Sequence, residues 1–165
     1  MLFQQAVPLL SVVFFLAGNS VAKHVDAKMS KLEEFFGKKY ELSESHNFDE
    51  FMSAIGVGLF TRKIAGAVTP VLDLSKEGDK YVITQKSTFK NMIIKFTPGV
   101  AFKQETPDGR TVNSVITIEG NKLHEVQKDD SGSETVIDRV FSDTEVNMKM
   151  HHGNVEATRV YKLLG

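Results

Sequence analysis

The C-terminal stretch VEATRVYKLL (155–164) combines strand-like alternation with an arginine and a tyrosine. Alternate side chains of a strand share one face, so Arg159 and Tyr161 lie together on its more apolar side. The segment SETVIDRVF (133–141) places Arg139 on an apolar face in the same way. A buried guanidinium is costly unless it is paired and hydrogen-bonded. No acid shares the face of either arginine, so the partner of a buried arginine would be a carboxylate that a ligand supplies.

Arginines in strands more often reach solvent along their long aliphatic stems. This alternative predicts that Arg139 and Arg159 lie on the surface without a shared partner. The common face of Arg159 and Tyr161 counts against it, but the sequence alone leaves both interpretations open.

Other reactive groupings are absent or poorly placed. The chain of 165 residues has no cysteine, which excludes thiol catalysis and disulfides. It has no Gly-x-Ser-x-Gly sequence to supply an α/β-hydrolase nucleophile. His151 and His152 are adjacent and would point apart in a strand, without an acid or cysteine at ligand spacing. We therefore expect no catalytic residue, no metal and no cofactor.

The elements that would position the arginines are mostly strands. Residues 37–44 predict a first strand, and residues 69–164 divide into nine alternating segments separated by turn signals such as Asp108-Gly109. Short connections favour an antiparallel meander, and closing such a sheet removes its exposed edges. The sequence therefore predicts an all-β fold, a ten-stranded antiparallel up-and-down β-barrel that encloses a ligand cavity.

Residues 47–68 interrupt the strands with apolar residues at helical spacing. Asn47 is the expected N-cap of a first helix. Gly56 and Gly58 divide the run into two short helices, with Val57 in the turn between them. This helix-turn-helix lies between strands one and two and has an apolar face, so we expect it to cap the open end of the barrel.

The N-terminus differs from the rest of a globular composition that is 41% hydrophobic and 25% charged, with a formal net charge of −1. This near-neutral balance argues against nucleic-acid binding. Residues 1–22 carry no charged side chain and end in Ser20-Val21-Ala22, small residues spaced like a signal-peptidase site. The apolar run 6–17 is too short for a comfortable membrane span.

We therefore predict a signal peptide over residues 1–22, an N-terminal extension over 23–36 and a barrel domain over 37–165. Secretion follows from this division. One alternative is a buried N-terminal helix. Another is a shorter cytoplasmic product that begins at Met29.

Several segments resemble the fatty-acid-binding protein family, the intracellular lipid-binding proteins. The resemblance is collinear from about Gly37 to Leu164. The segments that carry it are KKYELSESHNFDEFMSAI (38–55), GVGLFTRKIA (56–65), STFKN (87–91), DGRTVNS (108–114) and GNKLHEVQK (120–128). It implies a barrel of the β-clam type with a helix-turn-helix lid, and a monomer that binds lipid without converting it.

The family holds a carboxylate with an Arg-x-Tyr near the C-terminus and an arginine two strands earlier. The resemblance therefore implies that Arg139, Arg159 and Tyr161 bind the head group of a fatty acid inside the barrel.

The same comparison assigns residues to the entrance of the cavity. Phe89 is similar to the portal phenylalanine, and the residues similar to the lid and its lining are Phe48, Phe51, Met52 and Val57. Arg62 and Lys63 stand on the second helix, where members of the family carry basic residues that approach membranes. A basic pair on a helix is, however, usually just a solvated face.

Two features depart from the family pattern. The family is typically cytosolic without a signal peptide, and its segment after the portal often reads Glu-Phe-Asp-Glu where this chain has AFKQE (101–105). The main expectation is a carrier of long-chain fatty acids or similar amphipathic acids, with transient membrane contact through the lid. The alternatives are a lipid-modifying isomerase or hydrolase on the same barrel, and a structural sandwich with a dry core.

Overall fold

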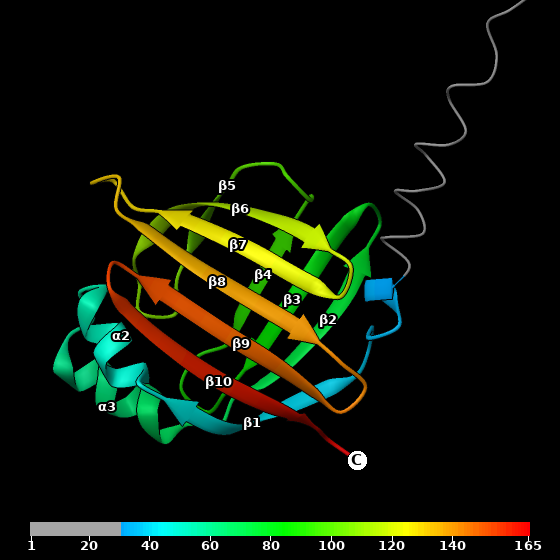
Figure 1. The fold of residues 1–165 in the computed structure, drawn as a ribbon, viewed down its shortest axis with the longest axis horizontal. Coiled ribbons are helices and arrows are strands. Elements are labelled where there is room, and N and C mark those ends of the chain that lie inside the picture. Colours follow the sequence, from blue (N-terminus) through cyan, green and yellow to red (C-terminus); the bar gives the residue numbers. More distant parts are fainter. Residues whose placement is uncertain (1–30) are drawn as a thin grey trace, which may run out of the picture.

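Ten antiparallel strands form one sheet in the computed structural model, which describes residues 31–165 (Figure 1). The order across the sheet is β4-β3-β2-β1-β10-β9-β8-β7-β6-β5, so chain neighbours pair throughout and β1 also pairs with β10. The strands are β1 (Lys39–His46), β2 (Val71–Glu77), β3 (Lys80–Lys86), β4 (Met92–Phe96), β5 (Phe102–Glu105), β6 (Thr111–Glu119), β7 (Lys122–Lys128), β8 (Glu134–Phe141), β9 (Glu145–His152) and β10 (Val155–Leu163). The predicted ten-stranded barrel with a helix-turn-helix between its first two strands is confirmed.

The first strand runs further than the sequence predicted, to His46 rather than 44. Its pairing with β2 involves only Lys39 to Glu41, but its pairing with β10 continues to His46. A register shift between Leu42 and Glu44 bends the strand on the way. The extension follows from this second partner, because β10 satisfies the backbone groups of β1 beyond the end of β2.

Closure of the sheet is incomplete. β4 and β5 stand at the two ends of the strand order, and no pairing joins them in residues 31–165. The ion pair between Lys90 Nζ and Glu105 Oε1, at 3.0 Å, connects the turn before β4 with the end of β5. The barrel is therefore nearly closed, with side chains rather than backbone hydrogen bonds linking its last two edges.

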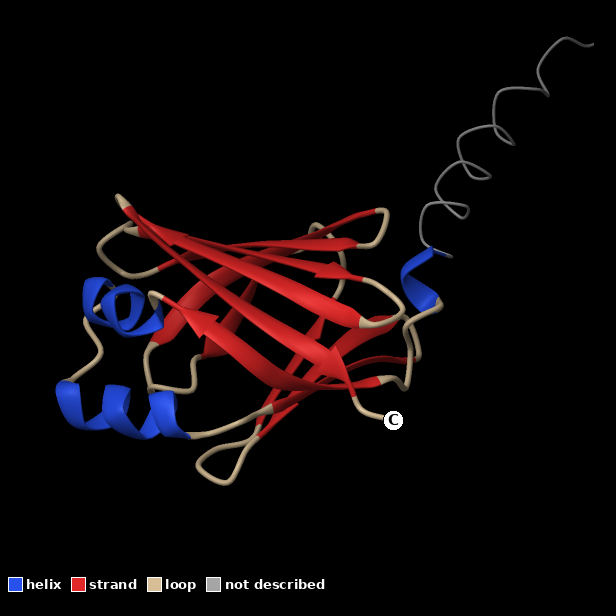
Figure 2. Ribbon diagram, turned by 60° about the horizontal axis from the view of Figure 1, so that its bottom comes forward, coloured by secondary structure: helices blue, strands red, loops and turns tan. Residues whose placement is uncertain are grey.

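The segment before β1 lies at the end of the barrel opposite the helices (Figure 2). Aromatic side chains pack against one another there. Phe35 stacks on Phe141 with ring centroids 5.9 Å apart, and Tyr40 meets Phe141 edge-on. Leu32 and Phe35 are buried in the core although they precede the predicted domain boundary at residue 37. Burial of such a side chain contributes about 1.5–3 kcal/mol. Part of the predicted N-terminal extension is thus a plug for this end.

The helices α2 (Phe48–Ala54) and α3 (Leu59–Ala67) form the lid at the other end. α2 buries Phe51 and Met52, but α3 buries no residue. The turn between them uses Gly56 at φ +86°, a left-handed conformation that favours glycine. No helix in residues 31–165 is long and apolar enough to cross a membrane.

The prediction for Asn47 is correct in position but wrong in mechanism. It stands directly before α2, yet its side chain makes no cap hydrogen bond to the helix. Its backbone is left-handed, with φ 56°, and its Nδ2 instead donates to the Glu156 carbonyl at 2.6 Å. Asn47 therefore fastens the start of the lid to β10.

Candidate functional site

The inner faces of the strands and the underside of the lid surround a mostly apolar cavity. The centres of water molecules have about 160 Å³ available inside it, on the order of ten times what one water needs. The predicted site residues that line it are Phe48, Phe51, Met52, Val57, Phe89, Arg139, Arg159 and Tyr161. The fold thus brings together residues that span more than a hundred positions of the chain. The roles assigned to them remain predictions.

β10 carries Arg159 and Tyr161 into the deep part of the cavity. They are 5% and 0% exposed, so the interpretation that placed the arginine in solvent is wrong. In the strand register Arg159 stands opposite Met148 of β9, and Tyr161 opposite Val146. The alternation read from the sequence therefore has the correct phase.

The Arg159 guanidinium has aromatic neighbours instead of an acid. Its carbon lies 4.0 Å from the Phe48 ring centroid and 5.9 Å from that of Tyr161. Within residues 31–165 no carboxylate forms an ion pair with it, and neither its Nε nor the Tyr161 hydroxyl has a hydrogen-bond partner. Burial lowers the pKa of Arg159 from its ordinary value, because removal from water disfavours the charged guanidinium. A bound anion would stabilise that charge.

The Tyr161 hydroxyl is the second polar group at this position. Burial raises its pKa, while the charges of Arg159 and Arg139 act in the opposite direction. The phenol therefore stays protonated at neutral pH and can donate a hydrogen bond. A cation and a phenol donor side by side suit a carboxylate, whose oxygens accept from both.

Arg139 has a different environment, and here the sequence interpretation was wrong. Its Nη1 lies 2.7 Å from Glu125 Oε2, and both side chains are buried. Gln127 Nε2 donates to the other carboxylate oxygen, Glu125 Oε1, at 2.7 Å. The partner of Arg139 is thus supplied by β7. The alternation within the two arginine-bearing strands does not reveal it, because Glu125 reaches Arg139 from a neighbouring strand.

The internal pair changes the charge that a ligand meets. The two arginines carry +2 and Glu125 carries −1, which leaves +1 for the deep part of the cavity. Since Arg139 is already neutralised, Arg159 is the cation available to a ligand. This balance fits one monoanionic head group.

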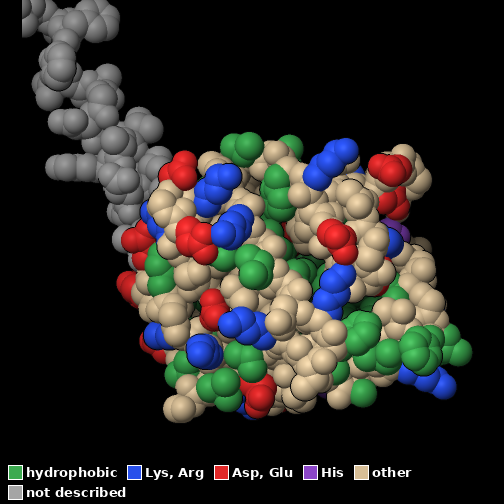
Figure 3. Space-filling view, turned by 180° about the vertical axis from the view of Figure 1, so that it is seen from behind, with side chains coloured by type: hydrophobic (Ala, Val, Ile, Leu, Met, Phe, Trp, Pro, Cys, Tyr) green, Lys and Arg blue, Asp and Glu red, His purple; other side chains and the backbone are tan. Residues whose placement is uncertain are grey.

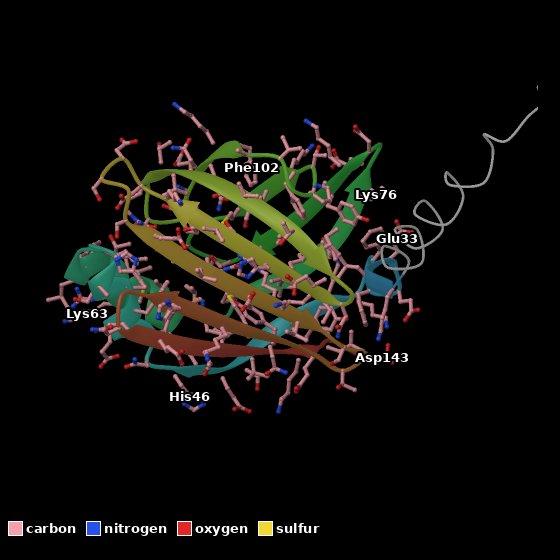
Figure 4. All side chains as sticks on the ribbon, turned by 45° about the horizontal axis from the view of Figure 1, so that its top comes forward. Glu33, His46, Lys63, Lys76, Phe102 and Asp143 are labelled. Carbon is pink, nitrogen blue, oxygen red and sulfur yellow. The ribbon has the colours of Figure 1, made fainter. Side chains whose placement is uncertain are left out.

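The lid is held together by Arg62. Its Nε contacts Asp49 Oδ1 at 3.0 Å, and its Nη1 donates to Ser53 Oγ and to the Val57 carbonyl. Arg62 therefore connects α3 to α2. Lys63 points to solvent (Figure 4).

Two further residues at this level of the barrel were not anticipated, namely Gln104 and Gln127. Both line the cavity and are at least nine-tenths buried. The signal for Gln127 in the sequence is weak, because KLHEVQK (122–128) has one clearly apolar residue on each face. Across residues 31–165, no three histidine, aspartate or glutamate side chains are grouped so as to hold a metal ion.

Comparisons with known proteins agree on one family. Residues 37–163 match the profile of the lipocalin / cytosolic fatty-acid binding protein family. Fatty acid-binding protein homolog 5 of Caenorhabditis elegans is 42% identical over 131 residues, which cover 78% of this chain and 96% of that protein. The fatty acid-binding protein from Drosophila melanogaster brain superposes with a TM-score of 0.73 at 49% identity, covering 78% of this chain and 98% of that one. The Schistosoma mansoni fatty acid binding protein in complex with arachidonic acid gives a TM-score of 0.77 at 40% identity, covering 82% and 99%.

Proposed function

The chain belongs to the lipocalin/cytosolic fatty-acid-binding protein family, and from this premise we propose that it binds and carries long-chain fatty acids or related amphipathic carboxylic acids. The observation that carries the proposal is Arg159, a buried cation with no acid partner in the described chain, beside Tyr161 in an apolar cavity. A fatty acid complements both parts, because its tail covers the apolar wall and its carboxylate meets the arginine.

The apolar chain would supply most of the affinity. Burial contributes about 0.8 kcal/mol per methylene, from which the cost of association is subtracted. A charge-assisted hydrogen bond to a guanidinium adds roughly 1.5–3 kcal/mol. The arginine therefore orients the ligand and favours acids over neutral lipids.

The alternative of a lipid-modifying enzyme has less support. No histidine appears among the described residues that line the cavity. Ser87, the serine among them, uses its hydroxyl in a turn, donating to the Lys90 carbonyl and accepting from the Phe89 and Lys90 N–H groups. Ser87 therefore has no adjacent base that would make it a nucleophile.

We expect the delipidated protein to bind palmitic acid at least tenfold more tightly than methyl palmitate. Titration calorimetry with both ligands tests this. Native mass spectrometry of the purified protein should show a monomer with one bound fatty acid. Failure to bind either ligand would reject lipid carriage, and release of palmitic acid from the ester would favour the hydrolase.

The outer surface of the lid supports transient contact with membranes. Leu59 and Phe60 are 58% and 78% exposed, and Lys63, three positions after Phe60 on the same helix, is also exposed. Figure 3 shows apolar side chains gathered at the lid end of the molecule. Exposed apolar residues next to a cation suit the interface of an anionic membrane.

Replacing Phe60 with serine should slow transfer of a fluorescent fatty acid to anionic vesicles several-fold, without changing its equilibrium affinity. The reason is that Phe60 lies outside the cavity, so only the encounter with the membrane loses apolar area. Val140→Ser, at an exposed position on the barrel wall, is the matched control. Equal transfer rates for both variants would count against membrane contact through the lid.

Secretion and the signal peptide remain predictions, because residues 1–30 lie outside the described structure. We propose that the secreted chain begins at Lys23, and N-terminal sequencing of protein from the medium of a eukaryotic host tests this. Met1 retained on intracellular protein would argue against it. A product beginning at Met29 would still include the core residues Leu32 and Phe35.

A further inference from the structure

Polar side chains continue from the arginines along the inner wall of the barrel to β5. Arg139 binds Glu125, and Glu125 binds Gln127. In the strand register Gln127 stands opposite Ser114, which stands opposite Phe102 of β5, labelled in Figure 4. We call Arg139, Glu125, Gln127, Ser114 and Gln104, the last lying two positions after Phe102, the polar band.

The band is deeply buried but incompletely hydrogen-bonded. Exposure does not exceed 8% for any member. Gln104 Oε1, Ser114 Oγ and Arg139 Nε have no hydrogen-bond partner in the described chain. Buried polar atoms are rarely left in this state, because each loses the hydrogen bonds that water would make.

Besides Arg139, the members of the band that line the cavity are Gln104 and Gln127. Glu125 and Ser114, in contrast, lie behind its surface. Glu125 occupies one N–H of the Gln127 amide, and the second N–H of that amide is left for another acceptor. The wall therefore presents a buried acceptor on β5 and a donor on β7.

The chemistry of this wall selects the group that fits it. A second carboxylate would lie close to the buried negative charge of Glu125, which contacts Gln127, and methylene groups would satisfy neither amide. A hydroxyl both donates and accepts, so it suits a site that offers an acceptor and a donor. It also fits either orientation of the Gln104 amide.

We propose that Gln104 and Gln127 form a second polar subsite, which takes a hydroxyl group on the hydrocarbon chain of the ligand. The protein then prefers hydroxy fatty acids to unsubstituted acids of the same length. This inference rests on the proposed function, because the carboxylate at Arg159 is what places the chain along the wall. A site built to hydrogen-bond a hydroxyl rejects the analogue that lacks it.

The test is titration calorimetry with stearic acid and the positional isomers of hydroxystearic acid. We expect the wild-type protein to bind at least one isomer about tenfold more tightly than stearic acid, the factor typical of one net hydrogen bond. Gln104→Leu should remove this preference while it keeps or improves the affinity for stearic acid. The matched control is Gln85→Leu, since Gln85 lines the same cavity from β3 and should leave the preference intact.

Two kinds of result would contradict the proposal, and they can be told apart. No isomer binding more tightly than stearic acid, or a preference that survives Gln104→Leu, would overturn the subsite while the carrier function stands. No binding of stearic acid at all would overturn the proposed function, and the subsite with it. If Gln104→Leu does not fold, Gln104→Met repeats the test, because its side chain matches glutamine in length and lacks the amide.

Discussion

Replacing Glu125 with glutamine should lower the free energy of unfolding of the ligand-free protein by about 3–5 kcal/mol. Glu125 is fully buried and forms the ion pair with Arg139. Glutamine keeps the volume but removes the charge, which leaves the Arg139 cation uncompensated. Chemical denaturation of the delipidated variant measures the loss. Glu105→Gln, which breaks the exposed pair with Lys90, is the control and should cost less than about 1 kcal/mol.

A second measurement on Glu125→Gln is the stabilisation of the variant by a bound ligand. A fatty acid should stabilise Glu125→Gln more than it stabilises the wild-type protein, because its carboxylate can pair with the freed Arg139 as well as with Arg159. Methyl palmitate should show no such difference. A loss of stability no greater than that of Glu105→Gln would mean that the internal pair contributes little to the fold.

Replacing Arg159 with alanine should raise the Kd of a free fatty acid by about tenfold to a hundredfold, where each factor of ten corresponds to about 1.4 kcal/mol. It should weaken the matching methyl ester much less, because the ester carries no charge to pair. Calorimetry of both ligands against both proteins measures the difference. Equal losses of affinity for the acid and the ester would show that Arg159 does not bind the carboxylate.

Arg110→Ala is the matched control for that experiment. Arg110 also lines the cavity, but its guanidinium is already bound to Asp108 beside the entrance. Burial alone would raise the pKa of Asp108, but the hydrogen bonds that Arg110 and Thr106 make with it hold the pKa below its ordinary value. The substitution therefore removes an arginine from the cavity wall without removing a free cation, and acid affinity should change little.

The sequence was sufficient where a local pattern determines the structure. The alternation around Arg159 gave the correct face, since a strand has only two, and the glycines at 56 and 58 divided the lid correctly. The phase of Arg139 was also correct. Each of these features depends on neighbours within a few positions of the chain.

What the sequence did not reveal depends on pairing between strands. Glu125 reaches Arg139 diagonally across β7 and β8, and the choice between the two faces of KLHEVQK (122–128) depends on which one turns inward. Asn47 binds β10, more than a hundred positions away, rather than its own helix. The unpaired edges of β4 and β5 likewise belong to the curvature of the whole sheet.

The contact between Phe48 and Arg159 joins the first residue of the lid to the candidate head-group cation. A cation–π contact of this kind contributes about 0.5–2 kcal/mol, depending on how far it is desolvated. Any displacement of α2 that takes Phe48 off the guanidinium therefore alters the free energy of an anion bound there. By thermodynamic linkage the effect is reciprocal: the factor by which lid opening changes anion affinity equals the factor by which the anion changes the opening equilibrium. The same coupling free energy therefore governs loading and release of the anion, and the contact between Phe48 and Arg159 contributes to it.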